Sequence, residues 1–339
     1  MNKIKLVAIA KDEACYLAEW IFHHLYFGFD EIEILYNRTS DNSVNILSKI
    51  SGIYPRVKFR SIDWIDYTAE NVAAHMQLIA YADAYEKAKK DFNFICFLDI
   101  DEFWVSRSFD KKIHDLIDRL DEECAVFFEW VTEAGCKEPF APLFKSAQYK
   151  LSRLGKSLIS TKAKVKTIDI HKPILWHPEC MIMADGGVFE DALSEGLNHQ
   201  FVSANRSSVK DFFVIHRMSR SEIEYFSILY RGDVYSKKKD FKVNRSVGYE
   251  LATKESINID FPDAAWGKYL ERRSHFFNSI SLEAEMESAK SSVMGRYQEA
   301  LSELAGGLSR HGYSLVDTLK NIEIPEVVIE IERYKNSGG

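Results

Sequence analysis

The first part of the chain alternates between short apolar runs and segments in which apolar residues recur every three or four positions. Short apolar runs bounded by polar turns are typical of buried strands, and the longer spacing is typical of helices with one buried face. The pattern predicts strands at 4–10, 32–36, 57–62 and 93–98, and helices at 12–27, 44–52 and 71–90. This alternation predicts a parallel sheet with right-handed crossovers and therefore an α/β fold class.

The rest of the chain has a weaker pattern. It predicts a helix at 110–120, a strand at 124–130, short strands at 158–161, 165–170 and 212–216, and a helix at 219–230. The region from Thr132 to Ser208 is rich in loops, as the surroundings of active sites often are. Beyond Ser279 a composition rich in Glu, Ala, Ser and Leu predicts helix to about Leu304. We therefore divide the chain into an α/β domain at 1–235 and a mainly helical C-terminal region at 236–339.

The composition is that of a globular protein with a sizeable core. Of 339 residues, 46% are hydrophobic and 28% are charged, and the 22 Phe, 16 Tyr and 6 Trp could also supply stacking surfaces. The formal net charge of −7 provides no overall basic field. Nucleic acid is therefore not expected as a partner.

The cysteines and the N-terminus indicate a location. Five scattered cysteines without a Cys-x-x-Cys pair disfavour zinc ribbons and thioredoxin-like redox chemistry, and favour buried thiols in a reducing compartment. The apolar run at 4–10 is too short for a signal peptide, and charged residues follow it at once. No run is long enough to span a bilayer. We expect a cytoplasmic protein, with peripheral contact at the inner membrane face left open.

Three carboxylates follow the predicted strand at 93–98, in Asp99-Ile100-Asp101-Glu102. Ligands of open α/β sheets bind beyond the carboxyl ends of the strands. On extended backbone Asp99 and Asp101 would point to the same side, where they could hold Mg²⁺ or Mn²⁺ against a diphosphate. A solvated strand end is the plain alternative. A phosphotransferase in which Asp99 attacks phosphate is another, although such enzymes usually carry their Asp-x-Asp after the first strand.

Several motifs, in this order, resemble those of family 2-like and family 92-like glycosyltransferases. They are the segments 5–13, 17–20 and 23–30, the loop at 36–43, the Asp-x-Asp-Glu-Phe motif at 99–103, and the segments 215–222 and 230–232. The resemblance covers about residues 4 to 235. It implies a GT-A fold, in which a Rossmann-like, mostly parallel sheet is flanked by helices, here with a C-terminal helical appendage. Arg217 departs from the pattern, because an aromatic residue usually follows the histidine.

The resemblance implies a metal-dependent, inverting transferase. It would move a sugar from a nucleotide-sugar, a UDP-sugar by default, to a hydroxyl of a surface polysaccharide, glycolipid or glycan. Two alternatives stay open: a non-catalytic nucleotide- or sugar-binding protein with a degenerate fold, and the phosphatase-type enzyme. The C-terminal region would pack on the domain, cover the acceptor cleft or mediate oligomerisation.

The predicted metal ligands are Asp99 and Asp101, with a histidine as the third. His216 and His171 are rivals for that position, and each could instead be an ordinary structural imidazole. Imidazole is compatible with Mn²⁺, whereas an all-oxygen shell suits Mg²⁺. The cofactor is therefore expected to be Mn²⁺ or Mg²⁺.

Residues near the carboxyl edge of the predicted sheet, including two early in the helix at 71–90, are candidates for contacts with the nucleotide. Structural roles explain several of them equally well, because acids are favoured at the N-terminus of a helix and polar residues are common in turns. The candidates are Asp12, Glu13, Asn37, Asp66, His75, Gln77 and Asp99.

Two acids are candidates for the general base that would deprotonate the acceptor hydroxyl. Asp191 ends a Gly-Gly-x-x-Glu-Asp segment similar to a loop of some family 2 enzymes. Glu133 follows the strand after the metal motif. A surface loop acid is the alternative for both, so the sequence leaves the base unassigned.

Overall fold

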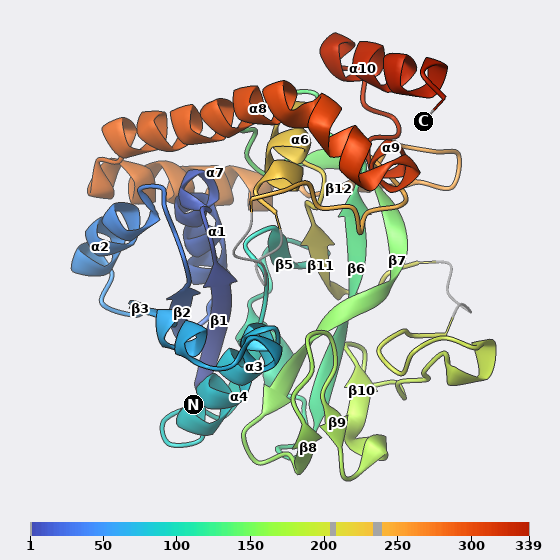
Figure 1. Cartoon of the computed structure of the whole chain (residues 1–339). Helices are drawn as coiled ribbons and strands as arrows, with labels where there is room; N and C mark the ends of the chain where they lie inside the picture. The colour runs from blue at the N-terminus through green and yellow to red at the C-terminus, as the bar shows by residue number, and fades with distance from the viewer. Residues whose placement is uncertain (1, 204–207, 233–238, 339) are drawn as a thin grey trace.

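A computed structural model describes residues 2–203, 208–232 and 239–338. A ten-stranded mixed sheet lies at the centre of this structure (Figure 1). Its strands follow the order β3-β2-β1-β4-β7-β6-β11-β5, with β10 beside β6 and β12 beside β7. The sheet strands are β1 (Ile4–Ala10), β2 (Glu31–Tyr36), β3 (Val57–Ser61), β4 (Phe94–Phe97), β5 (Glu102–Ser106), β6 (Ala125–Glu133), β7 (Ser146–Ser160), β10 (Met181–Met183), β11 (Phe212–His216) and β12 (Ile257–Asp260).

The predicted parallel half of the sheet is confirmed. β1 pairs in parallel with β2 on one side and β4 on the other, and β2 pairs in parallel with β3. The apolar residues of β1 and β4 are buried on both faces of the sheet, which explains their continuous apolar runs. The carboxyl ends of β1, β2 and β4 therefore meet at one edge, where the acids and polar loops of the sequence lie.

Beyond β4 the sheet becomes mixed. β7 is antiparallel to both β4 and β6, while β11 is parallel to β6 and antiparallel to β5. The short strand predicted at 158–161 is the end of the 15-residue β7. Sequence patterning missed its first part because that part is polar and only partly buried. The strand predicted at 165–170 is limited to β8 (Val165–Thr167), which pairs with β9 (Ile174–Leu175) outside the main sheet.

Helices cover both faces of the sheet and continue beyond it (Figure 1). The single helix predicted at 71–90 is interrupted, because His75, at φ −101° and ψ 22°, leaves the helical region before α4 begins. The helix predicted at 110–120 is limited to α5. The helices are α1 (Ala14–Tyr26), α2 (Ser43–Ile53), α3 (Glu70–Ala73), α4 (Met76–Ala88), α5 (Ile113–Ile117), α6 (Glu222–Tyr230), α7 (Asp263–Ile280), α8 (Glu283–His311), α9 (Tyr313–Thr318) and α10 (Pro325–Asn336).

The C-terminal region is helical, as predicted, and it includes α7, to which the sequence pattern assigned no element. Tyr269 and Phe276 of α7 are buried against Phe22 of α1, with ring centroids 5.0 and 5.5 Å apart. α8 lies along the top of the molecule in Figure 1 and packs on α6. The predicted domain boundary at 235 lies outside the described residues, so the division into two domains stays a prediction.

The α/β fold class, with helices α7–α10 after the sheet domain, is confirmed. In the described part of the chain, no helix combines the length and the apolar character that crossing a bilayer would require.

Candidate active site

Asp99 and Asp101 lie in the turn that joins β4 to β5. The backbone N–H of Glu102 donates to the carbonyl of Asp99 (3.0 Å), which closes the turn. The indole N–H of Trp20 on α1 lies 2.9 Å from the carbonyl of Asp99 and 2.8 Å from that of Glu102, and so fixes the turn to the helix layer. The prediction that both acids stand on extended backbone was wrong, because the chain turns here toward the opposite edge of the sheet. Both side chains nevertheless line one cavity.

His216 meets this turn from the neighbouring strand. The antiparallel register of β11 and β5 places His216 opposite Glu102. The Nε2 atom of His216 lies 3.5 Å from Oδ2 of Asp101. One ligand atom from each of Asp101, Glu102 and His216 lies within 4.8 Å of the other two. The structure therefore brings together the predicted ligands Asp101 and His216, and adds Glu102 to the group.

The charges around the turn favour an ionised Asp101. Burial works against its charged form, but His216 and Arg220 outweigh burial and hold the pKa of the Asp101 carboxyl below its usual range. Glu102 is fully buried, and burial raises its pKa well above the ordinary value despite the nearby Lys156. One oxygen of Glu102, Oε1, is buried and has no hydrogen-bond partner in the described part of the chain. An ionised carboxylate, an imidazole and an orphaned oxygen in one place are the donors that a divalent cation uses.

Asp99 is held by a lysine that the sequence analysis did not identify. Nζ of Lys156, on β7, lies 2.9 Å from Oδ2 of Asp99 and 3.5 Å from Oε2 of Glu102. Burial alone would lower the pKa of Lys156, but the two carboxylates more than offset burial and raise it. Lys156 occurs two residues before Leu158, in line with an apolar strand face, and this was the signal in the sequence that could have revealed it.

The rival histidine, His171, lies in the same cavity but outside the group around Asp101. Its Nδ1 lies 3.0 Å from the carbonyl of Gly155, and its ring lies edge-on to Trp130, 4.9 Å between centroids. Burial and the charge of Lys156 lower the pKa of His171 to about 4. Trp130 also approaches His216, at 4.3 Å between ring centroids. The geometry therefore favours His216 as the ligand and gives the cavity an aromatic wall.

The cavity has a volume of about 460 Å³, within the range of small-molecule sites. Of the predicted nucleotide contacts, Glu13, Gln77 and Asp99 line it. Sequence analysis assigned no role to several other lining residues, although Arg231 belonged to the resembling motif at 230–232. These residues are Trp130, Arg231, Lys242 and Arg245.

The remaining predicted nucleotide contacts are held by protein partners or lie apart. Asn37 donates from Nδ2 to Asp63 (3.0 Å), and Asp66 forms an ion pair with Arg38. His75 is exposed just before α4, and Asp12 lines a neighbouring cavity. The structure therefore does not bring Asp12, Asn37, Asp66 or His75 into the cavity of Asp99 and Asp101.

Neither predicted general base lines that cavity. Glu133, at the end of β6, is buried, and its Oε2 accepts a hydrogen bond from Nε of the equally buried Arg217 (2.9 Å). Arg217, the departure from the motif, is therefore half of an internal ion pair. Asp191 lies in a separate cavity of about 270 Å³, lined also by Lys172 and His199. Its Oδ1 accepts a hydrogen bond from the N–H of Leu193 (3.1 Å).

A sheet with acids and a histidine at the carboxyl end of its parallel half is the arrangement that the resemblance predicted for a GT-A-like glycosyltransferase. Glycosyltransferase family 92 matches residues 7–189, more than half of the chain, so the chain belongs to this family. Family membership makes the protein an enzyme of glycosyl transfer and confirms the resemblance. It favours transfer over the non-catalytic and phosphatase alternatives.

Three solved structures are similar to part of the chain. HddC from Yersinia pseudotuberculosis is 10% identical with a TM-score of 0.29, and the match covers 48% of this chain and 78% of that one. A mycobacterial protein is 12% identical with a TM-score of 0.27, over 48% and 54% of the two chains. Glucosyl-3-phosphoglycerate synthase from Mycobacterium tuberculosis, solved with Mn²⁺, uridine diphosphate and phosphoglyceric acid, is 12% identical with a TM-score of 0.25, over 48% and 56%. All three TM-scores are below 0.3. No curated protein sequence matches the chain.

Proposed function

We propose that the protein transfers a sugar from a nucleotide-sugar, a UDP-sugar by default, to a hydroxyl of a glycan, glycolipid or surface polysaccharide, with inversion at the anomeric carbon. The donor occupies the cavity of Asp99, Asp101 and His216. The observation that carries this proposal is the 3.5 Å approach of Asp101 Oδ2 to His216 Nε2 at that cavity.

The donor set fits Mn²⁺ or Mg²⁺. Two ligand atoms about 2.1 Å from an ion, at angles of roughly 90–110°, lie about 3.0–3.5 Å from each other. The Asp101–His216 separation of 3.5 Å agrees with this. Asp99, in the same turn, would bind the ion through water or contact the ribose. When bound, the ion stabilises the negative charge of the departing diphosphate as a Lewis acid.

The chain's own residues orient the donor and balance its charge. Lys242 and Arg245 line the same cavity and counter the diphosphate. Trp130 offers an aromatic face to the sugar. In the reaction the bond from the anomeric carbon to the phosphate oxygen breaks, with its electron pair leaving on the diphosphate. The acceptor oxygen forms the new bond and loses its proton to a general base.

Of the two proposed bases, Asp191 is the accessible one. The side chain of Glu133 is 2% exposed and bound to Arg217, so no acceptor can reach it without breaking that ion pair. Asp191 is partly exposed at the rim of its cavity. We therefore propose Asp191 as the base, on a loop that would approach the donor when substrates bind.

Release of UDP from a UDP-sugar in the presence of Mn²⁺ or Mg²⁺ tests the proposal. The wild type should release UDP only with a divalent ion, and chelation should abolish release. Asp101→Asn should lower the rate by at least about 100-fold because it removes charge stabilisation in the transition state. Turnover of p-nitrophenyl phosphate that is lost in Asp99→Asn would instead support the phosphatase alternative. Failure of UDP to bind with either ion would overturn the transferase proposal.

We also propose a cytoplasmic location. All five cysteines are free thiols, which supports a reducing compartment. Fluorescence microscopy of a tagged chain, with membrane fractionation at low and high salt, tests the location and any peripheral membrane contact.

A further inference from the structure

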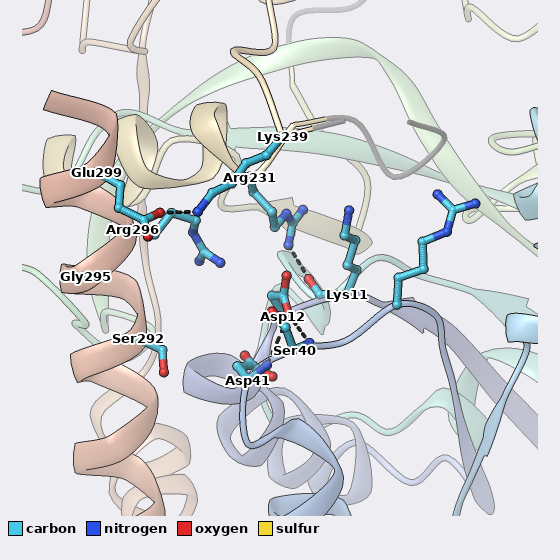
Figure 2. A pocket seen from close by; sticks show the side chains of 11 residues that line it. Lys11, Asp12, Ser40, Asp41, Arg231, Lys239, Ser292, Gly295, Arg296 and Glu299 are labelled. Atoms are coloured by element: carbon cyan, nitrogen blue, oxygen red, sulfur yellow. Dashed lines mark hydrogen bonds and ion pairs between the residues drawn. The ribbon is translucent and has the colours of Figure 1, made fainter. Parts of the chain in front are cut away.

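A second cavity, of about 450 Å³, lies next to the donor cavity and shares Lys11 and Arg231 with it (Figure 2). Its walls are the loops after β1 and β2, the end of α6, and one face of α8. Where α8 borders the space, it presents the small residues Ser292 and Gly295, which keep the cavity open. Among the described residues, five basic side chains line it: Lys11, Arg38, Arg231, Lys239 and Arg296.

The three acids of this cavity are already engaged. Oδ1 of Asp12 accepts hydrogen bonds from the N–H (2.6 Å) and hydroxyl (3.0 Å) of Ser40 and from the N–H of Asp41 (3.2 Å). Asp41 in turn accepts from the N–H of Ala14 (2.9 Å), at the start of α1. Glu299 forms an ion pair with Lys239. These carboxylates therefore hold the walls together, although the charge of Asp12 still favours the charged forms of Arg231 and Arg296.

Two arginines from different helices face the same space. Figure 2 shows Arg296 of α8 and Arg231, which follows α6, reaching toward it from separate walls. Nη1 of Arg231 donates to Glu13 (2.5 Å) and to the carbonyl of Lys11 (2.6 Å), but its buried Nε has no hydrogen-bond partner among the described residues. Nε of Arg296 donates to the hydroxyl of Ser227 (3.0 Å). Burial, and then the charge of Arg231, lower the pKa of Arg296. An anion between the two guanidinium groups would relieve this repulsion.

The loops that form the floor of the cavity hold an unfavourable backbone conformation. Asp12 and Arg38 have positive φ angles of 51° and 48°, although neither is glycine. Residues other than glycine seldom adopt this left-handed conformation. Such outliers cluster at ligand sites, where the surrounding structure maintains them. Both outliers line the same cavity, at the ends of β1 and β2.

The donor does not need these cations. Its own cavity contains Lys242 and Arg245 beside the metal ligands. Arg38, Lys239 and Arg296 line only the second cavity. Of the described residues, only Lys11 and Arg231, which line both cavities, lie between an anionic group in the second cavity and the donor. A molecule bound in this way lies next to the donor, where an acceptor must lie.

We propose that the second cavity binds a phosphomonoester carried by the acceptor, so that the acceptor is a phosphorylated molecule rather than a neutral glycan. The assignment to the acceptor rests on the proposed function, whereas the binding of phosphate does not. A volume of about 450 Å³ is much larger than a phosphate group, so the cavity also has room for part of its carrier.

Calorimetric titration of inorganic phosphate into protein saturated with UDP and Mg²⁺ tests the proposal. Phosphate should bind with one equivalent, and Arg296→Gln should weaken it about tenfold or more while UDP affinity stays within about twofold. Ser292→Asp should weaken phosphate binding by a similar factor, because its carboxylate repels the anion. Ser292 is exposed on α8, so this variant provides a second test if Arg296→Gln fails to fold. Lys290→Gln is the matched control, since it removes a charge from the same helix outside the cavity.

Absence of phosphate binding to the UDP-saturated protein would overturn the proposal. So would an equal loss of UDP and phosphate affinity in Arg296→Gln, because the cavity would then belong to the donor. If UDP itself fails to bind with either ion, the proposed function fails, and titration of UDP-free protein still tests the cavity.

Two further titrations distinguish the source of the phosphate. Glycerol 3-phosphate in solution and vesicles containing phosphatidic acid present the same phosphomonoester on different carriers. If glycerol 3-phosphate alone competes with inorganic phosphate, the acceptor is a soluble molecule. If the vesicles compete, the acceptor is linked to a lipid. Competition by neither would overturn the assignment to an ester.

Discussion

The ammonium of Lys156 lies 2.9 Å from the carboxylate of Asp99. Lys156 belongs to β7, which begins at Ser146, 49 residues after β4 ends at Phe97, and reaches Asp99 because β7 pairs with β4 in antiparallel fashion. Lys156 is fully buried, whereas the side chain of Asp99 is 37% exposed. The lysine also lies 3.5 Å from the buried Glu102. One internal cation therefore supports both acids that flank Ile100 and Asp101.

Lys156→Met should destabilise the folded protein by about 3 kcal/mol, because it leaves Glu102 and Asp99 without their buried partner. Urea unfolding followed by circular dichroism measures this change. Lys162→Met is the control, since Lys162 pairs with Glu122 at an exposed site, and it should change stability by less than about 1 kcal/mol. Equal stabilities of the Lys156 variant and the wild type would show that the lysine does not support the turn.

The parallel half of the fold could be predicted from sequence because β1 and β4 are buried on both faces and appear as apolar runs, in which Lys5 of β1 is the one charged residue. The acids that end them were visible for the same reason. Residues 146–157 gave no such signal, because polar residues dominate that part of β7. As a result Lys156, the partner of Asp99, was missed, although its place two residues before Leu158 was a signal that could have revealed it.

Contacts between distant segments were also beyond the sequence. Glu13 was predicted to contact the nucleotide, but its carboxylate is bound by Arg231, which is 218 residues away. Glu133 appeared as a loop acid and is instead paired with Arg217 inside the protein. In both cases the side chain's chemistry was visible, whereas its partner depends on how β11, α6 and the first strands pack together.

Asp101→Asn and His216→Gln should each weaken binding of Mn²⁺ in the presence of UDP by at least about tenfold, since each removes one ligand of the proposed ion. Electron paramagnetic resonance of free Mn²⁺ measures binding without any turnover. His171→Gln is the control, because His171 lies in the same cavity but outside the group around Asp101. A larger loss in His171→Gln than in His216→Gln would reverse the assignment of the imidazole ligand.

Asp191→Asn should lower kcat by about 100-fold or more and leave UDP affinity unchanged, as expected for a general base that acts on the acceptor. Glu133→Gln should mainly lower stability, because it leaves Arg217 buried without a charged partner. Transfer kinetics, UDP titration and urea unfolding of the two variants separate these effects. A kcat of Asp191→Asn close to that of the wild type would exclude Asp191 as the base.

The stability of the protein should decrease in acid through His23, which is fully buried on α1. Its Nε2 lies 2.8 Å from the carbonyl of Trp104, and its Nδ1 lies 3.1 Å from the hydroxyl of Tyr269. Burial lowers the pKa of His23 from 6.5 to about 3. Between these values the unfolded chain binds a proton that the folded protein does not. The stabilising contribution is therefore complete above about pH 6.5 and is lost progressively as the pH falls toward 3.

Each pH unit in this window should remove about 1.4 kcal/mol, or roughly 2.7 kcal/mol between pH 6.5 and pH 4.5. Urea unfolding at these two pH values measures the loss of free energy of unfolding. This loss should be smaller in His23→Gln than in the wild type, and the two losses should differ by about that amount. His177→Gln, at an exposed position, is the control and should keep the wild-type pH dependence. A substitution that only destabilises the protein lowers the free energy of unfolding equally at both pH values. If His23→Gln loses as much free energy of unfolding between pH 6.5 and pH 4.5 as the wild type does, the protonation of this histidine is not what weakens the fold.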